Sequence, residues 1–183
     1  MIVVTGMPGS GKDEFIKVAK RMGWIDIHMG DEVRKYAKLN KIPSSDSEIG
    51  RFASRERQTH GKDIWARRVW DDMKPENNYI IDGLRNLEEF EYFKTKDKDL
   101  ILIAIYTDRE ERLRRIVLRN RPDDVHSHEE LVSRDDRELS WGIGNAISLA
   151  DYMIVNDSTL DEFKLKAHEL LQKIREKNQM DLS

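Results

Sequence analysis

Five short apolar runs recur along the chain, separated by longer polar segments whose apolar residues follow a helical spacing. The runs cover residues 1–4, 24–29, 79–81, 100–106 and 152–155. Each has the length of a strand, and runs rich in Ile and Val are typical of strands buried on both faces. Residues 25–29 instead alternate between apolar and polar side chains, which indicates a strand at an edge of the sheet. Strands that alternate with helices predict an α/β fold with a parallel sheet of about five strands.

The clearest helix prediction covers residues 160–174, where six apolar residues share one stripe: Leu160, Phe163, Ala167, Leu170, Leu171 and Ile174. Thr159 and Glu162 form a capping-box pattern at its start, and Ser127 and Glu130 repeat that pattern before a second predicted helix. Polar residues follow every apolar run. Because ligands of parallel α/β sheets bind at the carboxyl ends of the strands, we expect a binding site along that edge.

Charged residues are numerous but nearly cancel: 32 Lys and Arg stand against 35 Asp and Glu, which gives a net charge of −3. This disfavours general nucleic-acid binding, since such proteins usually carry a basic excess. The lack of cysteine excludes disulfides and thiolate metal sites. The longest apolar run is far shorter than the roughly 20 residues of a membrane helix, and the N-terminus lacks a secretory pattern. The 183 residues suit a single domain, which we expect to be cytoplasmic and to bind neither nucleic acid nor membrane.

Residues 6–13 carry the strongest motif, and they lie directly between the first predicted strand and a helix predicted at residues 12–22. They match the P-loop pattern G-x-x-x-x-G-K. Glycines let backbone N–H groups turn inward around phosphate oxygens, the helix N-terminus adds positive charge, and the lysine reaches the β- and γ-phosphates of ATP. We therefore expect the whole segment to bind ATP, with the lysine also catalytic: Gly6, Met7, Pro8, Gly9, Ser10, Gly11, Lys12 and Asp13.

Asp13 departs from the motif, because this position normally holds a Ser or Thr whose hydroxyl ligates Mg²⁺. A carboxylate is also a hard oxygen ligand, so Asp13 is a candidate metal ligand. The alternative is that Asp13 turns away from the metal and stabilises the helix N-terminus electrostatically. Both hypotheses stay open at this point.

Residues 30–34, Gly-Asp-Glu-Val-Arg, resemble the segment that follows the second strand of adenylate kinases and related nucleoside monophosphate kinases. The resemblance implies that Arg34 binds the phosphate of an acceptor and that Asp31 lies near the transfer site, where it binds acceptor and takes part in catalysis. A guanidinium fork suits a phosphate on physical grounds as well. The alternative is an ordinary helix start, with Asp31 as the cap and Arg34 solvated.

Residues 82–85, Asp-Gly-Leu-Arg, resemble the Asp-Gly-Phe-Pro-Arg stretch of adenylate kinases, with Leu84 in the place of Phe-Pro. The resemblance implies that Arg85 is a second ligand of the acceptor's phosphate. Asp82 ends a predicted buried strand, which is where a carboxylate coordinates Mg²⁺ through water in P-loop proteins. The alternative is that Asp82 and Gly83 form only a turn.

Arg115 and Arg119 on one predicted helix, and Arg134 and Arg137 on the next, resemble the lid of adenylate-kinase-like enzymes. There an Arg-x-x-x-Arg segment and a returning helix close over ATP. The resemblance implies a lid at about residues 119–142 and a catalytic role for the four arginines, which would neutralise the transferring phosphoryl group. The alternative is a solvated helix of ion pairs.

Residues 150–157 resemble a stretch near the end of dephospho-coenzyme A kinases, which implies that Asn156 and Asp157 border the adenine of ATP. In their order, the motifs resemble an archaeal P-loop nucleotide kinase family related to adenylate kinase and dephospho-coenzyme A kinase. That resemblance implies a three-layer P-loop NTPase fold with a helical insertion at about residues 31–74 that covers the acceptor.

The leading functional hypothesis is a kinase that uses Mg²⁺ with ATP to phosphorylate a small phosphorylated or nucleotide-like acceptor, as a monomer or small homo-oligomer. One alternative is phosphorylation of a hydroxyl, as in dephospho-coenzyme A kinase, with Asp31 as the base. Another is an ATP-binding regulator or slow ATPase without a small-molecule acceptor, which the unusual Asp13 keeps open.

Overall fold

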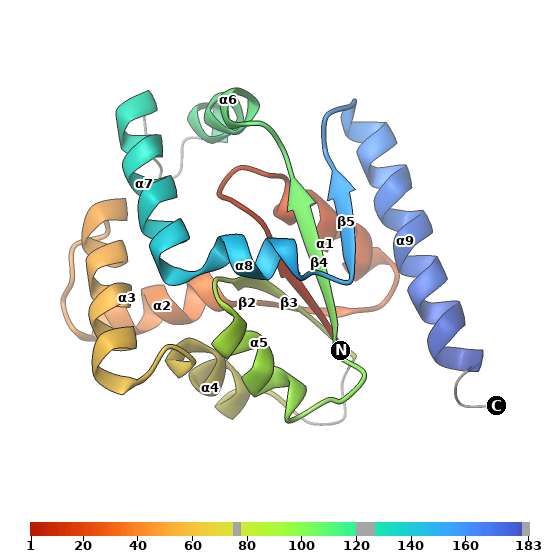
Figure 1. Ribbon diagram of the computed structural model, residues 1–183, viewed down its shortest axis with the longest axis horizontal. Helices are drawn as coiled ribbons and strands as arrows, with labels where there is room; N and C mark the ends of the chain where they lie inside the picture. The colour runs from red at the N-terminus through yellow and green to blue at the C-terminus, as the bar shows by residue number, and fades with distance from the viewer. Residues whose placement is uncertain (75–77, 120–126, 181–183) are drawn as a thin grey trace.

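The computed structural model describes residues 1–74, 78–119 and 127–180, and within this part five parallel strands form one sheet (Figure 1). The spatial order is β2-β3-β1-β4-β5. The strands are β1 (Ile2–Thr5), β2 (Ile25–His28), β3 (Tyr79–Leu84), β4 (Ile101–Tyr106) and β5 (Tyr152–Val155). The prediction of a parallel sheet of five strands is confirmed, and β2 lies at an edge, as its alternating pattern indicated.

Helices connect successive strands and continue after the last one. They are α1 (Lys12–Arg21), α2 (Met29–Leu39), α3 (Asp46–His60), α4 (Ile64–Asp71), α5 (Leu87–Lys94), α6 (Arg109–Arg119), α7 (His128–Trp141), α8 (Ile143–Ser148) and α9 (Leu160–Met180). The predicted caps are confirmed: Ser127 Oγ accepts from the N–H of Glu130, and Glu162 Oε2 accepts from the N–H of Thr159.

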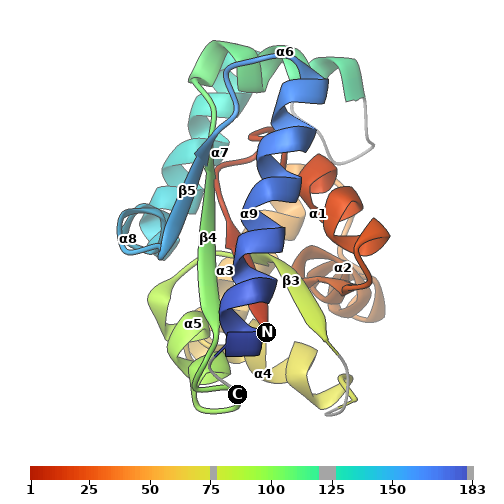
Figure 2. The same cartoon turned by 90° about the vertical axis from the view of Figure 1, so that its right-hand side faces the viewer.

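The central strands bury both faces because successive side chains point to opposite layers. In β1, Ile2 and Val4 pack with α1 and α9, whereas Val3 packs into the core on the other face, which includes residues of α2, α4 and α5. Figure 2 shows α1 and α9 together on one side of the sheet, with α8 on the other. The result is three layers, with an apolar core on each side of the sheet.

Two strand ends differ from the expected positions. The second run ends as a strand at His28, and Met29 begins α2, so Asp31 lies in the first turn of this helix and His28 is its N-cap. The third strand continues through Asp82 and Gly83 to Leu84. The proposed turn at Asp82 is therefore wrong, and this carboxylate lies inside β3.

The insertion expected at residues 31–74 contains most of α2, together with α3 and α4. The returning helix of the expected lid is α7, and it packs against α3 (Figure 1). Residues 120–126, which fall within the expected lid at about residues 119–142, lie outside the described residues.

Candidate active site

The loop between β1 and α1 is built around the ammonium of Lys12. Its Nζ donates to the carbonyl oxygens of Gly6 at 2.7 Å and Met7 at 3.2 Å. Burial lowers the pKa of Lys12 to about 8, and the nearby carboxylate of Asp82 opposes this shift. An anion bound in the loop would favour the protonated lysine, so the loop is suited to hold phosphate.

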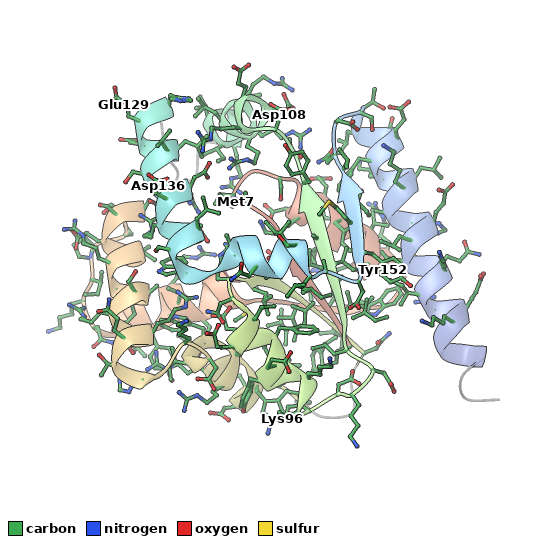
Figure 3. The ribbon with its side chains drawn as sticks, in the orientation of Figure 1. Met7, Lys96, Asp108, Glu129, Asp136 and Tyr152 are labelled. Carbon is green, nitrogen blue, oxygen red and sulfur yellow. The ribbon has the colours of Figure 1, made fainter. Side chains whose placement is uncertain are left out.

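Close packing fixes the path of this loop. Gly11 adopts a left-handed conformation with φ of 103° and caps α1, and a Cβ there would overlap Nδ2 of Asn156. That amide donates to the carbonyl oxygen of Ser10 at 2.9 Å, and Thr107 Oγ1 donates to the same oxygen at 3.0 Å. Met7 and Asp108, which follow β1 and β4, lie at the same end of the sheet (Figure 3). The loop is therefore positioned by residues from the carboxyl ends of two other strands.

Asp82 faces the same region from β3 and is almost completely buried. Its Oδ2 lies 3.2 Å from Nδ1 of His28, whose Nε2 lies 3.2 Å from Asp26. Burial alone would raise the pKa of Asp82, but the hydrogen bond to His28 and the charges of Lys12 and Arg85 lower it below its usual value. The hydrogen bond to Asp82 also raises the pKa of His28 to about 9, although burial opposes this. An ionised carboxylate, paired with His28, therefore lies near Lys12.

The other carboxylate oxygen of Asp82, Oδ1, is buried and has no hydrogen-bond partner among the described residues. Oxygen without a partner at this position suits a hard cation or its bound water. In the described part of the chain, no cluster of three or more His, Asp or Glu side chains could hold a metal by itself. The donor set therefore fits Mg²⁺ only when phosphate oxygens and water supply its remaining ligands.

Three arginines of α6 are directed toward the loop. The guanidinium of Arg112 is buried, donates to the carbonyl oxygen of Pro8 at 3.1 Å, and forms two hydrogen bonds with Asp135 of α7 at 2.6 and 2.9 Å. Arg115 donates to Thr107 Oγ1 and to the carbonyl oxygen of Asn156, both at 3.3 Å. This helix therefore attaches α7 and the end of β5 to the loop.

Arg119, the third arginine, pairs with Asp13 at 3.5 Å. Asp13 lies in the first turn of α1, where a negative charge is favourable, and its side chain is partly exposed. Ligation of Mg²⁺ by Asp13 requires this carboxylate to leave or share its arginine partner, and it stays a prediction.

A pocket whose Arg85 and Glu138 interact electrostatically with Lys12 is lined by five arginines and by apolar side chains of α2, α3, α4 and α7. Its cationic lining comes from Arg34, Arg57, Arg85, Arg134 and Arg137, and its apolar lining includes Met29, Ile49, Trp65 and Trp141. The two predicted acceptor ligands, Arg34 and Arg85, thus face one pocket. Arg134 and Arg137 line this same pocket, whereas Arg115 and Arg119 contact the loop region instead. The four predicted lid arginines therefore fall into two pairs with different surroundings.

Each arginine of the pocket has a carboxylate partner. Arg34 pairs with Asp31 at 2.6 Å at the exposed side of α2. Arg85 pairs with the buried Glu138 of α7 at 2.8 Å. The predicted site residues Asp31, Arg34 and Arg85 thus lie at or near the pocket. The charge of each arginine is balanced by a carboxylate of the protein.

The buried Arg57 of α3 lines the pocket, and the sequence motifs gave no reason to select it. Its Nη2 donates to Glu89 at 2.8 Å, and Glu89 also accepts from the N–H of Arg85 at 2.7 Å. Arg57 stacks on Trp141, with 4.4 Å between its guanidinium carbon and the ring centroid. The sequence did offer one signal, because Arg57 falls at an inward position of an amphipathic helix. An arginine buried at such a position requires a partner.

Asn156 and Asp157 follow β5, as the sequence predicted, but Asn156 is buried against the loop backbone. Its amide therefore holds the loop in place, and its contribution to a base-binding surface stays a prediction.

Across the described residues, no helix has the length and apolar character needed to cross a membrane.

The fold and the loop define a P-loop protein, and residues 2–139 match the family described as "AAA domain", to which the chain belongs. More narrowly, it belongs to the UPF0200 proteins. It is 54% identical to a UPF0200 protein of Thermoplasma volcanium over 93% of this chain and 96% of that protein. It is 41% identical to a UPF0200 protein of Sulfurisphaera tokodaii over 95% of this chain and 97% of that protein.

Two solved structures share the architecture. A shikimate kinase from Acinetobacter baumannii, in complex with shikimate, matches with a TM-score of 0.61 and 17% identity, over 96% of this chain and 93% of that chain. A gluconokinase from Sinorhizobium meliloti matches with a TM-score of 0.58 and 14% identity, over 98% of this chain and 95% of that chain. The three-layer P-loop kinase fold is confirmed. The specific relation to adenylate kinase and dephospho-coenzyme A kinase stays a prediction.

Proposed function

We propose that this protein transfers the γ-phosphoryl group of ATP to a small anionic acceptor. The observation that carries the proposal is the P-loop lying beside a separate pocket lined by Arg34, Arg57, Arg85, Arg134 and Arg137. One site suits the phosphates of ATP, and the other suits a second anion. A protein that only bound ATP would not need five arginines in an adjoining pocket.

In this mechanism, binding and charge neutralisation provide most of the catalysis. The loop backbone and Lys12 hold the β- and γ-phosphates, while Arg34 and Arg85 hold the acceptor. The bond between the γ-phosphorus and the bridging oxygen breaks as a bond to the acceptor oxygen forms, and ADP leaves with the bridging oxygen. Arg115 and Arg119 neutralise the negative charge of the transferring group from the side of α6.

Mg²⁺ bound with ATP would be held by Asp82, with Asp13 as a further candidate ligand. The ion would supply charge stabilisation for the phosphates. His28 keeps the carboxylate of Asp82 oriented through its hydrogen bond to Oδ2, which leaves Oδ1 available to a ligand. The other ligands of the ion would come from phosphate and water, because the protein supplies few carboxylates to this site.

The acceptor oxygen belongs to either of two chemical classes. A phosphate oxygen, as in a nucleoside monophosphate, is already anionic and needs no strong base. A hydroxyl acceptor, as in dephospho-coenzyme A or in shikimate, must lose a proton, and Asp31 is the candidate to accept it. The match to a shikimate kinase and a gluconokinase supports keeping the hydroxyl class beside the nucleotide class.

A panel of acceptors tests the proposal by acceptor-dependent formation of ADP from Mg²⁺-ATP. AMP, CMP and UMP represent the phosphate class, and dephospho-coenzyme A, shikimate and gluconate represent the hydroxyl class. We expect at least one acceptor to stimulate ADP formation strongly above the rate with ATP alone. ATP binding without stimulation by any acceptor would instead favour a regulator or slow ATPase.

Asp31→Asn separates the two acceptor classes once an acceptor is found. For a hydroxyl acceptor, loss of the base lowers kcat by about 100-fold or more, whereas for a phosphate acceptor kcat changes little. Glu32→Gln, one residue further along the same helix turn, is the matched control for the loss of charge.

A further inference from the structure

Asp46 lies between two arginines at the side of the pocket where α3 meets α7. Its carboxylate pairs with Nε of Arg134 at 3.2 Å and with Nη2 of Arg137 at 2.6 Å. Asp46 and both arginines line the pocket, and each side chain is more than four-fifths buried. A carboxylate of the protein therefore occupies a place where two guanidinium groups converge.

The donors in this region exceed the acceptors that the described residues provide. Nε of Arg137 is buried and has no hydrogen-bond partner among those residues, and the same holds for Nε and Nη1 of Arg57. The side chain of Arg57 is only 7% exposed, and it lines the same pocket. Buried N–H donors without partners are costly, so they favour binding of an additional acceptor group.

Contacts other than the carboxylate of Asp46 also hold this part of the fold. Ser45, not Asp46, caps α3, because its Oγ accepts from the N–H of Glu48. The contact between α3 and α7 is also supported by the hydrogen bond from Nε1 of Trp141 to Ser54 Oγ at 2.9 Å. Asp46 can therefore exchange its partners while the helices stay packed.

We propose that Arg134 and Arg137 form an anion subsite whose resident counter-ion is Asp46, and that a phosphate or carboxylate group of the ligand displaces it. This subsite is additional to the anion-binding pair Arg34 and Arg85. The assignment of the ligand rests on the proposed function: the acceptor is then a molecule with one anionic group near Arg34 and Arg85 and a second near Arg137. Asp46 then sets specificity, because only an anionic ligand compensates the arginines after displacement.

The proposal is tested by NMR titration of the full chain with inorganic phosphate and, separately, with acetate, in the absence of nucleotide. The side-chain Nε–H signal of Arg137 reports on the subsite, while the backbone N–H signals of Gly9 and Gly11 report on the P-loop. Three proteins are compared: the wild type, Asp46→Asn and Glu48→Gln. The last is the matched control, since Glu48 lies in the same first turn of α3 and pairs with Arg51 outside the pocket.

We expect Asp46→Asn to tighten binding at the Arg137 signal by about tenfold, because the competing carboxylate is gone. Glu48→Gln should change it less than about twofold, and the P-loop signals should titrate alike in all three proteins. A response to phosphate alone would assign the subsite to a phosphate group, and a response to both anions would extend it to carboxylates.

Weaker binding in Asp46→Asn would overturn the proposal, because it would mean that Asp46 holds the arginines in their binding geometry. Equal affinity in all three proteins, or no response of Arg137, would also overturn it. If Asp46→Asn does not fold, Asp46→Ser carries the same expectations. The titration contains no ATP, so its result does not depend on kinase activity. Anion binding at Arg137 without any kinase activity would contradict only the proposed function. Kinase activity without anion binding at Arg137 would contradict only the subsite.

Discussion

The ion pair between Arg112 and Asp135 provides the sharpest test of how α6 and α7 are attached to the P-loop. Asp135 is fully buried, and it forms two hydrogen bonds with a guanidinium that is only 5% exposed. The same guanidinium donates to the carbonyl oxygen of Pro8 in the loop. Asp135→Asn keeps the size of the side chain but leaves the charge of Arg112 uncompensated in the interior.

Removing one partner of a buried ion pair destabilises a protein by about 3–5 kcal/mol, because the remaining charge stays desolvated. An asparagine can still accept one of the two hydrogen bonds, which places the expected loss at about 3 kcal/mol. For a domain of this size, about 1 kcal/mol corresponds to a shift of about 2–4 °C in Tm. We therefore expect Asp135→Asn to lower Tm by about 6–12 °C.

Thermal unfolding followed by circular dichroism at pH 7 measures this loss. Asp136→Asn is the matched control, because it removes the same charge from the same helix. The neighbouring Asp136 is exposed (Figure 3). We expect this control to change Tm by less than about 2 °C. Equal Tm values for the two variants would refute the reasoning that a buried charge pair joins α6, α7 and the loop.

Three further predictions concern the loop and its carboxylate. Gly11→Ala should destabilise the fold by about 2 kcal/mol more than Gly23→Ala in urea unfolding, because both glycines have positive φ but only a Cβ at Gly11 would overlap Asn156; equal losses would contradict the close packing. The pKa of His28, raised to about 9 by its hydrogen bond to Asp82, implies stabilisation that is complete below pH 6.5 and lost as the pH rises through 9. The stability advantage of wild type over His28→Gln should therefore shrink by about 1–2 kcal/mol between pH 6 and 10 without metal or nucleotide, and a constant advantage would contradict the ion pair. Asp82→Asn should weaken ATP binding in Mg²⁺ by about tenfold but barely change it in EDTA, as measured by calorimetry; equal losses in both would argue against a metal role.

The layers of the fold could be predicted from the sequence because they depend on local patterns. Runs rich in Ile and Val encode strands buried on both faces, and the stripe through Phe163, Ala167 and Leu171 encodes a helix on the sheet. The end of β3 could not be predicted, since Asp82 and Gly83 are typical of a turn. Gly83 has a φ of 97°, yet pairing with β1 continues to Leu84, so tertiary contacts override the local signal.

The P-loop was identifiable because its chemistry is contained in eight consecutive residues. The contacts of Arg57 and Arg112 were not identifiable, because they depend on partners distant in the chain. Arg112 and Arg115 are three residues apart in one helix, yet one is buried against Asp135 and the other reaches the end of β5. Arg57 is held in the pocket by its ion pair with Glu89, and no spacing in the sequence relates these two residues.

The most direct test of phosphoryl transfer is to follow the γ-phosphorus of ATP by ³¹P NMR in the presence of an acceptor from the panel. For the wild type, we expect the γ-phosphorus signal to disappear as a phosphoester or phosphoanhydride signal of the acceptor appears in equal amount. Lys12→Met should abolish this transfer, while Lys17→Met, which removes an exposed lysine of the same helix, should retain it. Release of the γ-phosphorus only as inorganic phosphate, for every acceptor of the panel, would contradict the account.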